Sequence, residues 1–165
     1  MVIETERLVL RPLVLADLEE YLALHEDPEV TRFIDGLERP EAEKRLRENE
    51  LEWEERGYGK LAVLDRPSGR FLGRSGLKYW PQFEETEVGW TMHRDAWGRG
   101  LATEAARASV DWAFEAFDLP YLTAMVHPEN TASIHVAERL GMSQLRDDVL
   151  LGDRVRVFAL YRNPE

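Results

Sequence analysis

Hydrophobic residues recur along the chain with two spacings, and these divide it into strands and helices. In residues 6–11, ERLVLR, Leu8 and Leu10 alternate with the other side chains as in a half-buried strand, which Pro12 ends. In residues 16–25 the apolar positions recur at the three- and four-residue spacing of a helix, and acidic residues follow its start, where the helix dipole favours negative charge. The chain therefore begins with a strand and a helix.

The same patterns predict the remaining elements. Pro40 suits the first turn of a second helix, which the sequence RGYG ends. Asn130 is a plausible cap for a later helix, and Gly141 closes that helix. Further strands are predicted over residues 60–65, 71–80, 84–93, 121–127, 143–151 and 155–161, and further helices over residues 100–117 and 131–140.

The order of these elements, β–α–α–β–β–β–α–β–α–β–β, predicts the fold class. Several consecutive strands are joined by short turns, as in a hairpin, so the sheet is mixed and largely antiparallel, with six or seven strands and helices packed on it. The sequence contains no long linker, low-complexity segment or internal repeat. We therefore expect an α+β protein whose residues 1–165 form a single domain.

Charge and composition narrow the possible functions. The chain has 21 Lys and Arg residues against 32 Asp and Glu residues, a formal net charge of −11, which disfavours nucleic acid and anionic lipid as partners. It has no cysteine, so a thiol nucleophile is excluded, and its four histidines form no metal-binding pair, so no metal is expected. No membrane-spanning apolar run or secretory signal is visible, which predicts a cytoplasmic protein.

The segment HRDAWGRGLATEAA, residues 93–106, carries the strongest functional signal. It leaves a predicted strand, passes Gly98 and Gly100 and enters the longest predicted helix. Glycines let backbone N–H groups turn toward one point and the helix start adds positive potential, so the loop suits a phosphate, with Arg99 and Thr103 adding charge and a hydroxyl. A dinucleotide fingerprint needs glycine where Thr103 stands, and a Walker loop needs Gly-Lys-Ser/Thr, so neither nucleotide motif is present.

Two segments, EVGWTMHRDAWGRGLATEAARASVDWAF and HPENTASIHVAERLGM, resemble the GNAT family of acetyl-CoA-dependent N-acyltransferases. The opening TERLVLRPL and the EDPEV after the first helix resemble the subgroup that includes ribosomal-protein N-terminal acetyltransferases. The resemblance extends over residues 3–161 and implies helices on both faces of the sheet. It also implies a splay between the fourth and fifth strands, at residues 84–92 and 121–127.

The resemblance assigns acetyl-CoA, as cosubstrate, to this splay. Its pantetheine arm would hydrogen-bond the free strand edge near residues 90–92, and its pyrophosphate would lie on the loop amides. The family's Gln or Arg three residues before the first glycine is replaced here by Asp95, so Arg94 or Arg99 would supply the missing charge. The cofactor-binding residues implied are Trp90, Thr91, Met92, Arg94, Gly98, Arg99, Gly100, Ala102, Thr103, Asn130 and Ser133.

Without a cysteine, the acceptor amine must attack the thioester directly while both substrates are bound. The expected catalytic residues are Glu87 as base through a water, Ser133 near the departing thiol, and Asn130, which resembles the family residue that contacts the pantetheine or stabilises the reacting region. A backbone amide near Trp90 or Thr91 would stabilise the oxyanion. Simpler roles stay open: a solvated strand carboxylate for Glu87, a helix cap for Asn130 and a first-turn polar residue for Ser133.

The acceptor is expected to be a primary amine, either a protein N-terminus or a small molecule, because an acidic protein attracts cations. Residues 31–37 are expected near it, with Trp80 and Phe83 at its rim, and His127 and His135 are alternative bases. A catalytically silent acyl-CoA-binding sensor or regulatory module would share the loop and lack a working base. The protein is expected to be a monomer or a homodimer.

Overall fold

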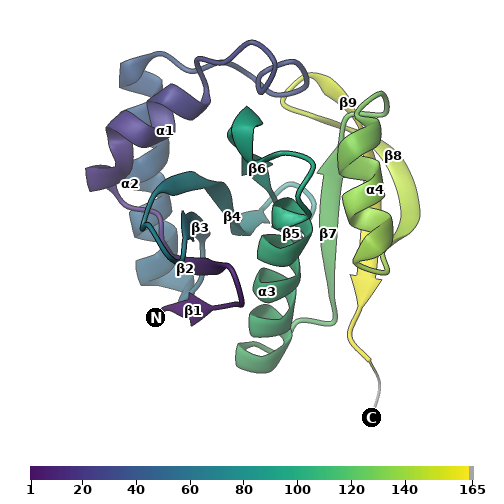
Figure 1. Ribbon diagram of the computed structural model, residues 1–165. Coiled ribbons are helices and arrows are strands. Elements are labelled where there is room, and N and C mark those ends of the chain that lie inside the picture. The colour runs from purple at the N-terminus through teal and green to yellow at the C-terminus, as the bar shows by residue number, and fades with distance from the viewer. Residues whose placement is uncertain (164–165) are drawn as a thin grey trace.

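The computed structural model describes residues 1–163, which form one nine-stranded sheet and four α-helices (Figure 1). The strands are β1 (Ile3–Glu4), β2 (Leu8–Pro12), β3 (Lys60–Asp65), β4 (Phe71–Trp80), β5 (Glu85–Val88), β6 (Thr91–Met92), β7 (Tyr121–Val126), β8 (Ser143–Leu150) and β9 (Asp153–Tyr161). The helices are α1 (Leu18–Leu24), α2 (Arg39–Arg56), α3 (Leu101–Ala116) and α4 (Thr131–Arg139), with single 3-10 turns at Leu15–Asp17 and Arg94–Ala96.

The strands lie in the order β1-β2-β3-β4-β5-β7-β9-β8, and β6 pairs with β4 outside this path. Only the β5–β7 pair is parallel among the described strands, which confirms the mixed, largely antiparallel sheet and the α+β class. The sheet has nine strands instead of six or seven for two reasons. The pattern did not predict the two-residue β1, and the strand expected over residues 84–93 is interrupted.

The interruption between β5 and β6 has a local cause in β4. Leu77 faces Val88 and Arg74 faces Thr91, so β5 and β6 keep one register against β4. Between these pairs Gly76 has a φ of 92°, a conformation outside the strand region, although its carbonyl still accepts from the Gly89 amide at 3.0 Å. The regular strand pairing with β4 is therefore interrupted at Gly89.

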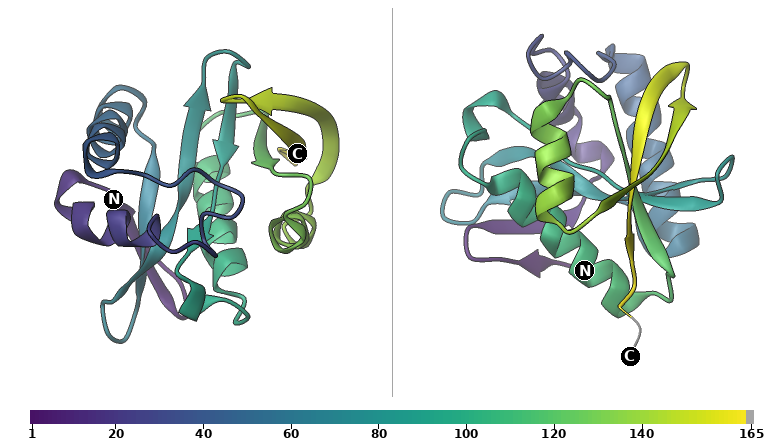
Figure 2. Two further views of the ribbon diagram at one scale, coloured as in Figure 1. Left: turned by 90° about the horizontal axis from the view of Figure 1, so that it is seen from above. Right: turned by 90° about the vertical axis from the view of Figure 1, so that its right-hand side faces the viewer.

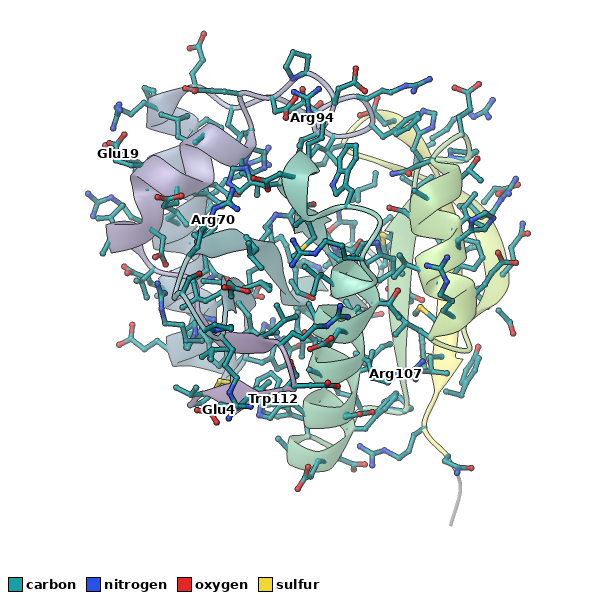
Figure 3. The ribbon with its side chains drawn as sticks, in the orientation of Figure 1. Glu4, Glu19, Arg70, Arg94, Arg107 and Trp112 are labelled. Atoms are coloured by element: carbon teal, nitrogen blue, oxygen red, sulfur yellow. The ribbon has the colours of Figure 1, made fainter. Side chains whose placement is uncertain are left out.

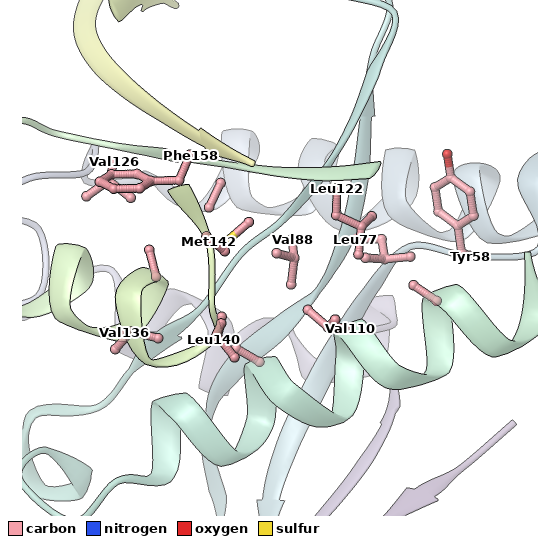
Figure 4. Close-up of a cluster of buried hydrophobic side chains, with 14 residues drawn as sticks. Tyr58, Leu77, Val88, Val110, Leu122, Val126, Val136, Leu140, Met142 and Phe158 are labelled. Carbon is pink, nitrogen blue, oxygen red and sulfur yellow. The ribbon is translucent and has the colours of Figure 1, made fainter. Parts of the chain in front are cut away.

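Helices cover both faces of the sheet, as expected (Figure 2). On one face, Leu46 of α2 belongs to the same buried cluster as Phe71 of β4. On the other, Val110 of α3 packs in one cluster with Leu77, Val88 and Val136 of α4 (Figure 4). Both helical layers are held by burial of apolar surface, worth about 25 cal/mol per Å².

The sheet opens between β6 and β7, so that its two halves diverge (Figure 1). β5 and β7 share a single residue pair, Glu87 with Thr123, and β6 pairs only with β4 within the described part of the chain. The splay predicted between the fourth and fifth expected strands is therefore present. It leaves one edge of β6 without a neighbouring strand.

Local capping signals are confirmed where β7 leads into α4. Asn130 precedes α4, and its side-chain oxygen accepts from the Ser133 amide at 3.2 Å. At the other end Gly141 has a φ of 87°, and Met142 donates to the Ala137 carbonyl at 3.0 Å, the bond of a Schellman ending.

None of the helices in residues 1–163 is long and apolar enough to cross a membrane.

Candidate active site

The glycine loop between β6 and α3 has the backbone form that its sequence predicts. Gly98 has a φ of 75° and Gly100 a φ of 74°, both in the left-handed region where glycine is favoured. Gly100 caps α3, whose first amides have no partner within the helix. A side-chain carbon at Gly98 would meet no atom within 4 Å, so this turn of the loop is open on its outer side.

Contacts from the segment between β1 and β2 fix the loop on α3. The Arg7 guanidinium donates to the Arg99 carbonyl at 2.8 Å and to Glu104 of α3 at 2.7 Å. Glu104 also accepts from the Thr5 hydroxyl at 2.6 Å. The sequence patterns did not single out these three residues, because their contacts join positions almost a hundred residues apart.

The donors of this loop fit a pyrophosphate. The N-terminal amides of α3 are available for an anion, and the helix dipole is positive there. The Thr103 hydroxyl oxygen is buried and has no hydrogen-bond partner among the described residues. A phosphate oxygen would give this hydroxyl the acceptor it lacks.

The two charged residues at the start of the loop are already paired. Asp95 forms an ion pair with Arg70, which holds the pKa of its carboxyl below the usual range. Arg94 pairs with Asp27 at 3.2 Å and so reaches the segment that follows α1 (Figure 3). Within residues 1–163 Arg99 forms no ion pair, so it is the basic side chain of this loop left available for an anion.

Predicted site residues on the two sides of the splay meet directly. The Trp90 indole nitrogen donates to the Ser133 hydroxyl oxygen at 3.3 Å, although the two residues are 43 positions apart. The Met92 carbonyl accepts from Trp97 at 2.9 Å, which ties the edge of β6 to the glycine loop. Asn130 caps the helix that carries Ser133, which confirms the helix-cap role, while its contact with pantetheine stays a prediction.

Glu87 lies at the base of the splay, on the sheet face that carries α1 and α2. One carboxylate oxygen accepts from the Trp80 indole at 2.8 Å, and the other accepts from the Met125 amide of β7 at 3.1 Å. Burial raises the pKa of Glu87, although these two hydrogen bonds oppose the shift. The interpretation of Glu87 as a solvated strand carboxylate is therefore wrong, because it bridges both sides of the splay.

A cleft of about 300 Å³ opens on this same face, between α2 and the turn joining β8 to β9. Its lining includes Lys60, Lys78, Trp80 and, from the turn, Leu151. Trp80 lines the cleft as expected. Residues 31–37 and Phe83 do not line it, since Phe33 packs near His127 and Phe83 lies under the Arg146 guanidinium.

Two of the histidines form hydrogen bonds with the backbone, and a third is exposed. His25 is buried beneath α1, and its Nδ1 donates to the Tyr21 carbonyl at 2.8 Å, since a carbonyl can only accept. Burial lowers the pKa of His25 to about 4, helped by nearby Arg74. His127 accepts from the Glu129 amide at 3.1 Å and stacks near Phe33, and His135 is exposed on α4.

A family model described as the acetyltransferase (GNAT) domain matches residues 7–143. This chain belongs to the GNAT acetyltransferase family. The GNAT assignment agrees with the open sheet, the glycine loop and the splay, and it confirms the resemblance found in the sequence.

Relatives and solved structures of other GNAT proteins support the same conclusion. The chain is 37% identical over 128 residues to the uncharacterised protein YkkB of Bacillus subtilis strain 168, covering 72% of this chain and 71% of that protein. It is 29% identical over 153 residues to the uncharacterised N-acetyltransferase p20 of Bacillus licheniformis, covering 87% and 84%. An acetyltransferase from Agrobacterium tumefaciens strain C58 superposes with a TM-score of 0.88 at 32% identity, covering 98% and 95%.

The fold also matches that of ribosomal-protein acetyltransferases. RimL, a ribosomal L7/L12 α-N-protein acetyltransferase solved in complex with coenzyme A, superposes with a TM-score of 0.82 at 18% identity, covering 98% of each chain. At this identity the likeness concerns the GNAT fold alone.

Two basic residues of this GNAT site were missed by the sequence patterns. Lys60 begins β3 and Arg74 lies within β4, and both face the α2 side of the sheet beside Glu87. A charged residue within a largely buried strand, such as Arg74 in FLGRSGLKYW, was the signal available. A second cavity, of about 440 Å³, lies where β5 and β7 begin and is lined by none of the predicted cofactor or catalytic residues.

Proposed function

We propose that this protein transfers an acetyl group from acetyl-CoA to a primary amine by direct attack within a ternary complex. The observation that carries the proposal is the position of Glu87. Its carboxylate bridges the two sides of the splay and faces the α2 side, next to the Trp80 wall of the cleft. The glycine loop lies at the end of β6. The cosubstrate and the acceptor can therefore meet near Trp90.

The glycine loop and β6 form the proposed acetyl-CoA site. Backbone amides from Gly98 to Thr103 bind the pyrophosphate, and Arg99 adds positive charge. The unpaired edge of β6, residues Thr91–Met92, accepts the pantetheine amides as a neighbouring strand would. Trp97 holds this edge against the loop through its bond to Met92.

Glu87 is the proposed base, acting through a water. An α-amine has an ordinary pKa of about 8 and a lysine-like amine about 10.4, so the ammonium must lose a proton before it attacks. A carboxylate whose pKa is raised by burial is a stronger base than an exposed one, and Glu87 has this property.

Ser133 and a backbone amide serve the other end of the reaction. The Ser133 oxygen accepts from Trp90, so its own O–H remains a donor for the thiolate that leaves as the C–S bond breaks. A backbone N–H at Trp90 or Thr91 stabilises the oxyanion that forms on the attacked carbonyl. Asn130 acts indirectly, because its side chain accepts a hydrogen bond from the Ser133 backbone amide and so positions Ser133. The chain has no cysteine, which excludes an acyl-cysteine intermediate.

We also propose that residues 1–165 act as one acetyltransferase domain. The cleft takes residues from α2 and from the β8–β9 turn, and the loop is fixed by Thr5 and Arg7. Elements from both ends of the described chain therefore contribute to one site.

Two measurements test the proposed function. Thermal unfolding is compared with acetyl-CoA, CoA, ATP or NAD, and stabilisation by the CoA species alone is expected. CoA release is then measured against a panel of protein N-terminal peptides, amino acids, polyamines and aminoglycosides. No stabilisation by either CoA species would overturn the proposal. Binding without CoA release on any amine would favour the silent acyl-CoA sensor instead.

A further inference from the structure

The cleft beside Glu87 is lined by three cations, Arg45, Lys60 and Lys78, and by three carboxylates, Glu41, Glu48 and Glu52. The chain has a net charge of −11, yet Arg45, Lys60, Arg74 and Lys78 gather on the α2 side of the sheet. The positive charges of Arg74, Lys78 and Arg45 all act on Lys60, and those of Arg74, Lys60 and Arg45 all act on His25. Several basic side chains therefore lie close to Lys60, where the charge of Glu87 opposes theirs.

Two of these four cations already have partners, and two do not. Arg45 pairs with Glu41 at 3.4 Å, and Lys78 pairs with Glu52 at 3.8 Å. Within residues 1–163 neither Lys60 nor Arg74 forms an ion pair or a side-chain hydrogen bond, and the Arg74 Nε is a buried donor without a partner. A buried donor left unpaired costs about 1 to 3 kcal/mol.

The strand register places these two cations next to the reacting region. Lys60 faces Gly76, Lys78 faces Glu87, and Arg74 faces Thr91. Along the strand direction, Arg74 and Glu87 thus lie on opposite sides of Gly89. Each is displaced from it by two residues, or about 7 Å. Gly89 has no side chain, and a carbon added there would lie 3.5 Å from an Arg74 terminal nitrogen, so the guanidinium extends over this open position.

We propose that Lys60 and Arg74 bind a carboxylate of the acceptor, which is therefore an amino acid or a short peptide whose carboxylate lies a few bonds from the amine. This inference rests on the proposed function, since it concerns the acceptor side of the same site. Arg74 offers planar paired donors suited to a carboxylate, and Lys60 offers a point charge. Glu87, on the far side of Gly89, then faces the amine.

Burial and its basic neighbours lower the pKa of Lys60 well below its ordinary value. A carboxylate bound beside Lys60 would reverse part of this shift, because an opposite charge stabilises the ammonium. Polyamines and aminoglycosides lack such a group and bring further positive charge toward Lys60 and Arg74. We therefore expect Lys60 and Arg74 to favour an acceptor with a carboxylate over the polycationic acceptors that the net charge had suggested.

The test compares acceptors that differ only in their carboxylate. Free amino acids and dipeptides are assayed for CoA release beside the same compounds as C-terminal amides, with wild-type protein and the variants Lys60→Met and Arg74→Met. Wild-type protein is expected to favour the free acids by about tenfold or more in kcat/KM, mainly through the acceptor KM. Both variants are expected to lose this preference and to keep the KM for acetyl-CoA.

Lys44→Met is the matched control, because Lys44 is an exposed lysine of α2 outside the cleft lining. It should keep the preference for free acids. Stabilisation by acetyl-CoA verifies that each variant is folded. If Arg74→Met is too unstable to assay, Arg74→Lys is used in its place. This variant retains the charge and should keep part of the preference for free acids. Equal rates on acids and amides overturn the carboxylate assignment, as does a preference unchanged in both variants. Turnover of neither form also overturns it, whereas the proposed function is judged separately by acetyl-CoA binding and the wider amine panel.

Discussion

The indole nitrogen of Trp90 donates to the Ser133 hydroxyl at 3.3 Å and so connects the strand side of the open sheet to α4. Because the serine oxygen is the acceptor in this bond, its proton is free to be donated elsewhere. This arrangement gives Ser133 a defined orientation beside the place where the two halves of the sheet separate.

Ser133→Ala is expected to lower kcat by about a hundredfold, as loss of a general acid typically does, while the KM for acetyl-CoA changes little. Steady-state CoA release measures both constants. Thr131→Ala is the control, since Thr131 is an exposed hydroxyl two residues earlier on the same helix. Equal kcat values for Ser133→Ala and wild-type protein would show that water protonates the thiolate.

Glu87→Gln is expected to lower kcat/KM by about a hundredfold or more, because glutamine cannot accept the amine proton. Wild-type activity should fall as the pH is lowered through the pKa of Glu87, which burial raises above its ordinary value of 4.5, since only the ionised form acts as base. The variant should lose this acidic limb of the pH profile.

Glu84→Gln serves as the control for Glu87, because Glu84 is an exposed carboxylate immediately before β5. It should leave both the rate and the pH profile unchanged. An unchanged profile in Glu87→Gln itself would remove Glu87 from the proton transfer and leave it a purely structural bridge.

Gly98→Ala tests the glycine loop. Forcing alanine into the left-handed conformation costs about 1 to 2 kcal/mol of folding free energy, and relaxation of the loop would displace amides needed for the pyrophosphate. The KM for acetyl-CoA should rise. Gly69→Ala is the matched control for Gly98→Ala. Gly69 also has a φ of 75° and open space around it, but it lies in the β3–β4 turn. A similar loss of stability without a change in KM is expected there.

His25 makes stability depend on pH. The folded protein holds the pKa of this residue at about 4, below its ordinary value of 6.5, so the unfolded chain binds the proton more readily. Its contribution is intact above pH 6.5 and is lost as the pH falls toward 4. The total is about 3 kcal/mol, since one pKa unit corresponds to about 1.4 kcal/mol and the ring is 4% exposed.

Urea unfolding at pH 7 and pH 4.5 measures this dependence. The variant His25→Gln retains a side-chain N–H for the Tyr21 carbonyl but does not titrate. It should be less stable than wild-type protein at pH 7 and should lose less stability on acidification. Parallel losses in the two proteins would contradict the assignment to His25.

Leu151 has a φ of 51° in the β8–β9 turn and is 65% exposed at the edge of the cleft. A leucine in this conformation is strained, whereas asparagine accepts it, so Leu151→Asn should stabilise the protein by about 1 kcal/mol. The acceptor KM should rise, because the cleft loses an apolar wall. Thermal unfolding and acceptor kinetics check the two effects separately, and a stabilised variant with unchanged acceptor KM would exclude Leu151 from acceptor binding.

Most helices and strands follow from local patterns. The N-cap at Asn130, the Schellman ending at Gly141 and the positive φ values of Gly98 and Gly100 depend on residues adjacent in sequence, and each was predictable. The division of the expected strand at Gly89 was not, because it depends on the conformation of Gly76 in the neighbouring strand.

Most of the proposed acetyl-CoA site could be predicted from the sequence, since one continuous stretch from Trp90 to Thr103 supplies the strand edge, the turn and the helix start. The proposed acceptor side depends on the tertiary structure. The pairing of β3, β4 and β5 in one register brings together Lys60, Arg74 and Glu87. The amino-acid composition does not predict this pairing. A net charge sums over all residues, whereas charges act mainly within about 8 to 10 Å in salt solution. We therefore expect these three side chains, more than the overall charge, to set what the proposed acceptor site binds.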